Sequence, residues 1–245
     1  MTAEPVVGPS VDLRGDHHIH STFSDDATGS PLENLDAAAA AGLGVVRMVD
    51  HVREDTTYVP EFLRAVRALP GRPGLTVLTG VEAKIVDAAG RVDAPPAVLA
   101  GVGGPHGPDR VLLADHRFPG PDGPWSPAET RRRLATGGLT TADTVQLLLD
   151  ATVAAVRRVG RAQLAHPFSI LPKIGLSEDD VTDELIDALA ACTVATGTPV
   201  EVNEKWRCPG ARIVGRLAKA GVWLVASTDA HRPDDVGRYS WLRGL

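Results

Sequence analysis

Gly15-Asp16-His17-His18-Ile19-His20 is the segment in which the pattern that indicates the fold first appears. It closes a short apolar segment, residues 11–18, that we expect to form a β-strand. Side chains alternate between the two faces of a strand, so His18 and His20 share one face and His17 points away from it. Two imidazoles at one strand end are a weak signal alone, but the rest of the chain repeats the pattern.

An apolar run that ends in a histidine or a carboxylate recurs through the whole chain. Strands are expected at residues 11–18, 44–50, 75–82, 110–115, 161–166, 199–203 and 222–228. Helical patterns lie between them, at residues 31–41, 60–69, 142–159, 178–192 and 210–220. The residues that close or follow the later strands are His51, Glu82, His116, His166, Asp229 and His231. Strand and helix in this alternation imply parallel strands joined by βαβ units, in either an open sheet or a closed barrel.

These strand ends predict a metal site. The carboxyl ends of parallel strands meet on one face of an α/β fold, where sites are built. Six of the eight histidines would converge there, together with several carboxylates. Both groups are ligands for zinc, manganese and iron, and the set exceeds what one ion can use. A satisfied polar group at a strand end explains any one of these histidines, but not their recurrence.

Composition limits the class of protein. The chain has 245 residues, 43% hydrophobic and 23% charged, so we expect one soluble globular domain over residues 1–245. A net charge of −6 argues against nucleic acid as a partner. No apolar run approaches the roughly 18 residues that cross a membrane, and the N-terminal MTAEPVVGPS lacks the features of a secretory leader. With only two cysteines, Cys192 and Cys208, these features predict a cytoplasmic protein without a membrane partner.

Two segments rich in glycine and proline interrupt the alternation, at residues 84–109 and 117–139. Loops of this length in a compact domain are usually functional lids or mobile segments. The second contains Arg131-Arg132-Arg133, which we expect at a solvated helix start. Residues 117–139 are therefore a candidate lid.

The polar motifs occur in a fixed order along the chain. They are Asp16-x-His18-x-His20-Ser21, Ser24-Asp25-Asp26, Asp50-His51, Gly80-Val81-Glu82, His116, Ala165-His166-Pro167 and Asp229-Ala230-His231. This set resembles the PHP (polymerase and histidinol phosphatase) superfamily over residues 16–237. The resemblance implies an α/β fold, a distorted (β/α)7 barrel, with the metal site at the carboxyl ends of the strands. It also implies two to three divalent ions, zinc, manganese or iron.

The resemblance further implies roles for single residues. The metal ligands would be His18, His20, Asp26, His51, Glu82, His116, His166, Asp229 and His231. Asp25 and Asp26 both fit the position after the histidine pair, and Asp26 is preferred. Asp16 and Asp50 match positions that orient neighbouring histidines. Glu82 would bridge two ions, because one carboxylate can supply an oxygen to each.

The remaining histidines and cysteines are interpreted as structural. His17 faces away from the site, and His106 lies in a loop rich in glycine and proline. Cys208 follows the sixth strand, but no free histidine stands ready to activate its thiol. Cys192 lies in an apolar helix and is expected in the core.

A metal cluster alone does not decide the reaction. Clustered ions lower the pKa of a bridging water and stabilise charge on attacking and leaving oxygens, which suits a phosphoester, an amide or an ester. A cationic clamp favours phosphate. The basic residues that follow strand ends, and so are expected to bind substrate, are Arg117, Lys205, Arg207 and Arg232. Glu201-Val202-Asn203 before them is similar to a family region that contributes to substrate binding.

The sequence thus predicts a metal-dependent phosphoesterase of the histidinol phosphatase type, acting on a small phosphorylated metabolite through a metal-activated hydroxide. Arg117 and Arg207 would steady the phosphate, and Asp229 or His231 would assist proton transfer. The alternative is a metal-dependent amide or ester hydrolase, and a third reading is a non-catalytic, metal-stabilised partner domain. The sequence does not decide whether the protein forms a homo-oligomer.

Overall fold

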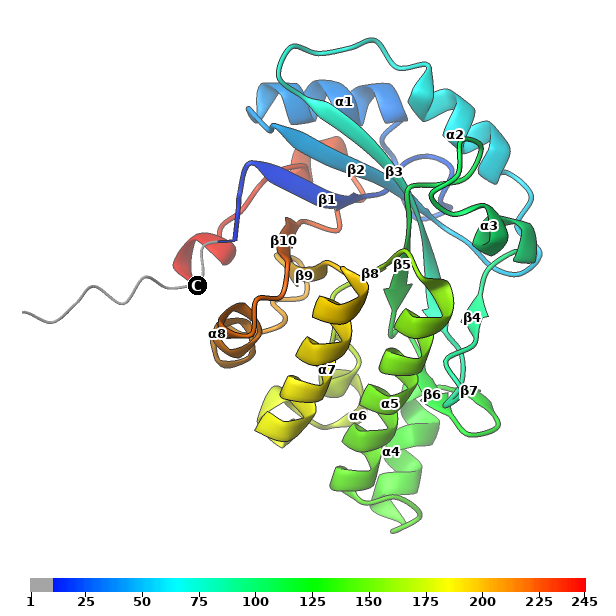
Figure 1. Cartoon of the computed structure of the whole chain (residues 1–245), viewed down its shortest axis with the longest axis vertical. Helices are drawn as coiled ribbons and strands as arrows, with labels where there is room; N and C mark the ends of the chain where they lie inside the picture. Colours follow the sequence, from blue (N-terminus) through cyan, green and yellow to red (C-terminus); the bar gives the residue numbers. More distant parts are fainter. Residues whose placement is uncertain (1–10) are drawn as a thin grey trace, which may run out of the picture.

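Seven parallel strands form one sheet that curls into a barrel (Figure 1). The computed structural model describes residues 11–245, so the N-terminal MTAEPVVGPS, which we judged to lack a leader, lies outside the described residues. In sheet order the strands are β1 (Gly15–Ile19), β2 (Val45–His51), β3 (Thr76–Ile85), β5 (Arg110–Ala114), β8 (Ala162–Leu164), β9 (Val200–Asn203) and β10 (Leu224–Ser227). A parallel bridge between Ile19 and Ala230 joins β1 to the segment after β10. The predicted barrel and all of its strands are confirmed.

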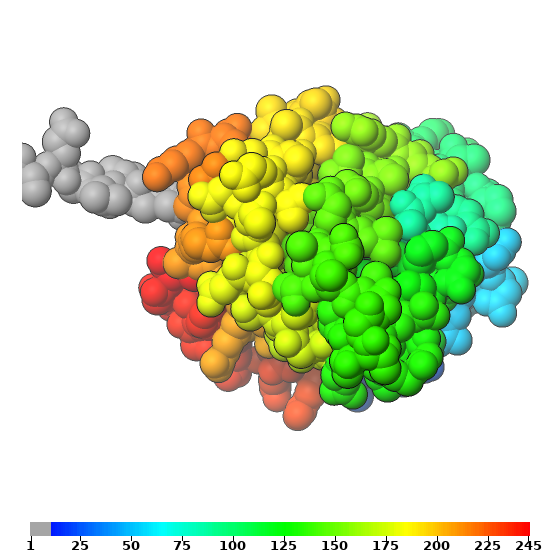
Figure 2. Space-filling view, turned by 90° about the horizontal axis from the view of Figure 1, so that it is seen from below, coloured from blue at the N-terminus to red at the C-terminus, as the bar shows by residue number. Residues whose placement is uncertain are grey.

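Helices connect the strands and cover the outside of the barrel. Those that match predicted segments are α1 (Pro31–Ala40), α2 (Val59–Arg67), α5 (Thr141–Val159), α7 (Asp183–Thr196) and α8 (Ala211–Lys219). Helix α1 begins at Ser30, whose hydroxyl accepts from the Glu33 amide while the Glu33 carboxylate accepts from the Ser30 amide. The green to yellow part of the chain, which includes α5 and α7, forms much of the face in Figure 2.

The predicted helix at 178–192 is wrong at its start. Ser177 caps only a single turn of 3₁₀ helix, η1 (Glu178–Asp180), and Val181 is extended. Thr182 then caps α7 by accepting from the Leu185 amide at 3.4 Å. Two successive caps divide what the pattern presents as one helix.

The two segments expected as long loops carry secondary structure. Residues 84–109 contain the end of β3, the short strand β4 (Val92–Asp93) and helix α3 (Pro96–Gly101). Residues 117–139 contain a hairpin, β6 (Phe118–Gly120) and β7 (Gly123–Trp125), then helix α4 (Pro127–Ala135). The Trp125 ring packs where a side chain on Gly120 would sit, and Ser126 caps α4. Arg131-Arg132-Arg133 was expected at a helix start but lies in the second half of α4. There Arg132 and Arg133 form ion pairs with Glu129.

A register shift interrupts β1 at the position of His17. Asp16 pairs with Val46 but Ile19 pairs with Met48, so β1 holds one extra residue between them. The strict two-residue alternation fails at this bulge. His17 is 8% exposed, and its carbonyl accepts from the buried Gln163 amide. Burial and the charge of Arg47 lower the pKa of His17 to about 4. It is thus a buried neutral residue, as its interpretation as a structural histidine expects.

The main apolar core lies between the barrel and its helices. Phe62 of α2, Leu148 of α5 and Ile186 of α7 are fully or almost fully buried in it. Helix α6 (Leu171–Ile174) follows β8 and buries Leu171. This packing fixes the strand ends that carry the site. Within residues 11–245, no helix has both the length and the apolar character needed to cross a membrane.

Candidate metal centre

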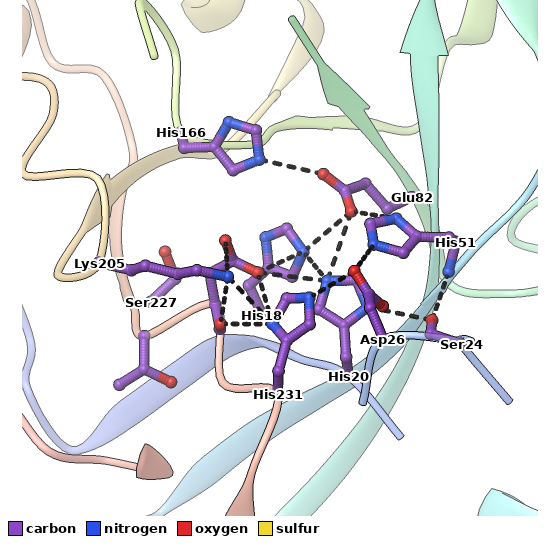
Figure 3. Close-up of polar contacts among 12 residues, drawn as sticks. His18, His20, Ser24, Asp26, His51, Glu82, His166, Lys205, Ser227 and His231 are labelled. Carbon is purple, nitrogen blue, oxygen red and sulfur yellow. Dashed lines mark hydrogen bonds and ion pairs between the residues drawn. The ribbon is translucent and has the colours of Figure 1, made fainter. Parts of the chain in front are cut away.

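The residues predicted as ligands gather at the carboxyl-terminal mouth of the barrel. Figure 3 labels most of them, namely His18, His20, Asp26, His51, Glu82, His166 and His231. They come from strands that are far apart in sequence and adjacent in the sheet. Four sets of ligand atoms lie within 4.8 Å of one another, namely His20 with His51 and His231, His18 with Glu82 and His166, His18 with His20 and Asp229, and His51 with Glu82 and His116.

Glu82, near the end of β3, lies at the centre of these sets. Its Oε1 is 2.8 Å from His116 Nε2 and 3.0 Å from His166 Nε2. Its Oε2 is 2.8 Å from His51 Nδ1 and 3.4 Å from His20 Nε2, yet it makes no aligned hydrogen bond within residues 11–245. A carboxylate oxygen buried without a hydrogen bond is costly, and a cation at this point would satisfy it.

His18, His20 and Asp229 form a fully or almost fully buried group. His18 Nε2 and His20 Nε2 lie 2.9 Å apart, and Asp229 Oδ1 is 3.3 Å from His20 Nε2. Two imidazole nitrogens that face each other need a proton or a cation between them. Burial alone would lower the pKa of His20, but the Asp229 and Glu82 carboxylates outweigh it and raise that pKa. The carboxylates therefore create a site that favours positive charge.

His51, His231 and Asp26 form a more open group. Asp26 Oδ2 is 3.4 Å from His51 Nε2 and 3.2 Å from His231 Nε2. Its side chain is 51% exposed, whereas that of Glu82 is 1% exposed. Asp25 lines the adjacent cavity, and no ion pair joins it to a histidine in the described residues. The geometry thus favours Asp26 over Asp25.

Asp16 and Asp50 hold the loops that carry ligands. Asp16 accepts from the Thr228 amide at 3.0 Å and the Thr228 hydroxyl at 2.6 Å, directly before Asp229. Burial raises the pKa of Asp16 to about 6. Asp50 accepts from the Ser24 hydroxyl at 2.6 Å, and that hydroxyl lies 3.3 Å from His20 Nδ1. Asp50 therefore acts on His20 through the Ser24 hydroxyl, whereas Asp16 accepts its hydrogen bonds mainly from backbone amides.

Ser169 and Asp115, which the sequence analysis did not single out, orient His166. Its Nδ1 is 3.0 Å from Ser169 Oγ, and Ser169 donates to Asp115 at 2.6 Å. Burial opposes protonation, but Asp115 and Glu82 raise the pKa of His166 to about 10. The signal was present in the sequence, because Asp115 closes a predicted strand and Ser169 lies one helical turn after His166.

Trp206 and Lys205 select the orientation of Asp229. Trp206 Nε1 donates to Asp229 Oδ2 at 2.7 Å, and Lys205 Nζ lies 3.2 Å from the same oxygen. Oδ1 is left facing His20. The Asp229 backbone has a φ of 52° and that of His166 a φ of 30°, values that non-glycine residues rarely adopt. Strain of this kind clusters at functional sites.

Two open cavities border the cluster. One, of about 410 Å³, lies against His51 and His116 and is lined by Phe23 and Tyr58. The other, of about 380 Å³, lies against Asp229 and His231. The basic residues that line them are Arg53 and Lys84 in the first and Lys205, Arg207 and Arg238 in the second.

The structure separates the four predicted substrate-binding residues into two pairs. Lys205 and Arg207 line the cavity beside Asp229, and Lys205 Nζ is 3.1 Å from His231 Nδ1. Arg117 and Arg232 are exposed and line neither of the two cavities. The position of a residue after a strand end does not determine where a long exposed side chain points. For the same reason, the sequence did not identify Arg53, Lys84 and Arg238 as residues that line the two cavities.

The residues interpreted as structural lie away from the cluster or are inert. His106 lines a separate, mainly apolar cavity of about 320 Å³ with Val59 and Leu63 of α2. Cys192 is buried in α7. Cys208 is also buried, and burial holds the pKa of its thiol well above its usual range. A thiolate nucleophile is disfavoured there.

No protein-family model matches this sequence, and no curated protein is detectably similar to it. The fold does match solved structures. Histidinol phosphate phosphatase from Lactococcus lactis, solved with zinc, L-histidinol and phosphate, matches with a TM-score of 0.65 and 14% identity over 93% of this chain and 88% of that one. A provisionally assigned histidinol phosphatase from Listeria monocytogenes matches with a TM-score of 0.60 and 14% identity over 91% of this chain and 97% of that one. This chain therefore shares its barrel fold with solved structures that are named as histidinol phosphatases.

Proposed function

We propose that this protein is a metal-dependent phosphoesterase of the PHP superfamily that hydrolyses a small phosphorylated metabolite. The observation that carries the proposal is the Glu82-centred cluster, in which a buried carboxylate with an unsatisfied oxygen lies among histidines from four strand ends. Such a donor set matches zinc, manganese or iron. The solved relative that holds zinc and phosphate on the same fold supports this reading.

Two to three ions would fit the cluster. His18, His20 and Asp229 would hold one, with Glu82 Oε2 beside them. His116 and His166, together with Glu82 Oε1, would hold a second ion, so Glu82 would be shared by the two sites. Asp26, His51 and His231, the open group, would hold a third ion.

Bound divalent ions supply an activated water and stabilise charge on the phosphoryl oxygens. Lys205 and Arg207 would hold the phosphate, because both line the cavity beside Asp229. The histidines of the cluster hold the pKa of Asp229 well below its usual range despite burial, so this carboxylate stays ionised and is a poor proton donor. Burial and the nearby His20 lower the pKa of His231, which leaves His231 as the candidate for proton transfer.

A metal-dependent amide or ester hydrolase is the second candidate on the same cluster. The cationic side chains at both cavities favour phosphate instead, since phosphate oxygens require arginine or lysine partners. The third hypothesis is a non-catalytic, metal-stabilised domain that binds a partner. Only the arrangement of the metal-binding residues supports it. The single-domain assignment and the cytoplasmic location stay predictions of the sequence.

The test measures phosphate release and metal content on one preparation. The protein is stripped with a chelator, reloaded with zinc, manganese or iron, and assayed with p-nitrophenyl phosphate and with phosphorylated metabolites. We expect two to three ions per chain and turnover that depends on them, with turnover lost in His166→Ala. Bound metal with ester or amide hydrolysis, and no phosphate release, would favour the second candidate. A protein that binds no metal after reloading would contradict both.

A further inference from the structure

Glu201 lies in the centre of the barrel, directly below the metal cluster. It is on β9 and has no exposed surface. The sequence resemblance placed its segment in substrate binding, but its carboxylate contacts neither cavity that borders the cluster. A buried carboxylate of this kind is costly unless its oxygens are fully used. Its partners therefore show what it does.

The first partner is a predicted metal ligand. His18 Nδ1 lies 3.0 Å from Glu201 Oε1 and 3.1 Å from Oε2. A carboxylate only accepts hydrogen bonds, so this contact requires the His18 proton on Nδ1. When the ring is neutral, His18 Nε2 carries no proton, and it faces His20 and Glu82. The contact fixes the tautomer that presents Nε2 to an ion.

The second partner belongs to another strand. The His166 amide donates to Glu201 Oε2 at 3.1 Å. The His166 backbone has a φ of 30°, a conformation that persists only where its surroundings enforce it. One carboxylate on β9 thus holds the ring of a ligand on β1 and the strained backbone of a ligand after β8.

The remaining partners of Glu201 are donors as well. The Gln163 side-chain amide donates at 2.7 Å, the Ser227 hydroxyl at 2.9 Å and the Asn203 side-chain amide at 3.3 Å. Arg47, which is 2% exposed, donates to Gln163 in turn at 3.1 Å. An amide at position 201 would place its own N–H groups against these donors. The site therefore requires a carboxylate and not merely a polar side chain.

We infer that Glu201 is a positioning residue that holds His18 in its Nε2-binding tautomer and fixes the backbone of His166, so that two strands present their ligands to the metals together. This role goes beyond the proposed function, because it concerns metal affinity and holds whatever substrate is hydrolysed. It acts through His18 and His166 and needs no contact with substrate.

The test compares zinc affinity in three proteins by competition with a chromogenic chelator. Glu201→Gln is expected to weaken zinc binding about 10- to 100-fold, the usual effect of removing a group that orients a ligand. The matched control is Asp109→Asn, a half-buried carboxylate at the opposite end of the barrel that accepts from the Thr79 amide at 2.7 Å. It is expected to bind zinc within about twofold of the unmodified protein, since it touches none of the predicted ligands.

A second readout does not depend on the folding of a variant. Histidine ¹H–¹⁵N correlation spectra of the zinc-loaded, unmodified protein are expected to show the His18 proton on Nδ1 and the metal on Nε2. Zinc on Nδ1 of His18, or unchanged zinc affinity in a folded Glu201→Gln protein, would overturn this inference alone. Failure of the unmodified protein to bind zinc would overturn it together with the metal centre.

Discussion

The metal cluster has a buried half and an open half, and they are built differently. The side chains of His18 and His20 are 0% exposed, whereas those of His51 and His231 are 29% and 17% exposed. In the buried half the ring nitrogen that points away from the cluster has a partner, as Glu201 is for His18 and Ser169 is for His166. In the open half both nitrogens of His51 face acidic residues of the cluster itself.

This difference indicates which part of the cluster is held rigidly and which part is accessible to substrate. Imidazoles held on both sides keep one orientation and bind an ion tightly. Histidines beside a cavity, such as His51, have room for exchange of an ion and for entry of a phosphate. We therefore expect the buried half to be the stable metal site and the open half to be the exchangeable one.

The largest effect is expected from Glu82→Gln, because Glu82 Oε2 lies 3.4 Å from His20 in the buried half and 2.8 Å from His51 in the open half. We expect the metal content to fall to less than one ion per chain. We also expect turnover of p-nitrophenyl phosphate to fall about 10³-fold, since metals supply several kcal/mol of transition-state stabilisation. Metal analysis and steady-state kinetics measure both, with the exposed Glu61→Gln as a control. Full metal content in the Glu82 variant would contradict a shared carboxylate.

A smaller effect is expected from Lys205→Ala, which removes a cation from the cavity edge. Trp206 still donates to Asp229 Oδ2 in this variant and keeps that ligand oriented. Loss of one charged hydrogen bond to phosphate should lower kcat/KM by about 10- to 100-fold while the metal content stays the same. Arg117→Ala is the matched control, because Arg117 is exposed and lines neither cavity. Equal losses in the two variants would place the phosphate elsewhere.

Protons should compete with metal in the buried half. The carboxylates that raise the pKa of His166 to about 10 keep its imidazole protonated at neutral pH in the absence of metal, although burial opposes this. An ion must displace that proton, so apparent zinc affinity should rise with pH, by about tenfold per pH unit for each proton released, until pH reaches about 10. Calorimetry in buffers of different ionisation enthalpy counts the protons. Zinc binding without proton release would contradict this electrostatic account.

The smallest effect separates the two halves directly. His51→Ala should remove one ion from the open half and leave the ions of the buried half, because His18, His20 and Asp229 do not depend on His51 for their orientation. We expect the metal count to fall by one and the melting temperature of the loaded protein to change by only a few degrees. Mass spectrometry under native conditions resolves the count. Loss of every ion would show that the two halves are one unit.

The sequence was sufficient for the fold class and for the gathering of histidines and carboxylates at one end of the barrel, because both depend on which residues end each strand. His166 and Asp229 follow apolar runs that can be recognised without a structure. Helix α4 could also have been predicted, since Ser126, Pro127 and Glu129 form an ordinary helix start. The pattern was obscured by the many prolines around it.

Other features depend on geometry that no local pattern encodes. The bulge in β1 is set by the pairing of β1 with β2, so the buried position of His17 could not follow from alternation. The role of Glu201 depends on the approach of β1 and β8 in space, and its segment had been assigned to substrate. The choice between Arg117 and Lys84 as a cavity residue depends on the path of the surrounding loops.

The most direct test of the metal centre is anomalous X-ray scattering at the zinc edge from crystals of the zinc-loaded protein. Our account predicts an anomalous peak bounded by His18, His20 and Asp229, and a second between His116 and His166, with Glu82 in contact with both. Zinc bound only outside this cluster, or no ordered zinc at all, would contradict it.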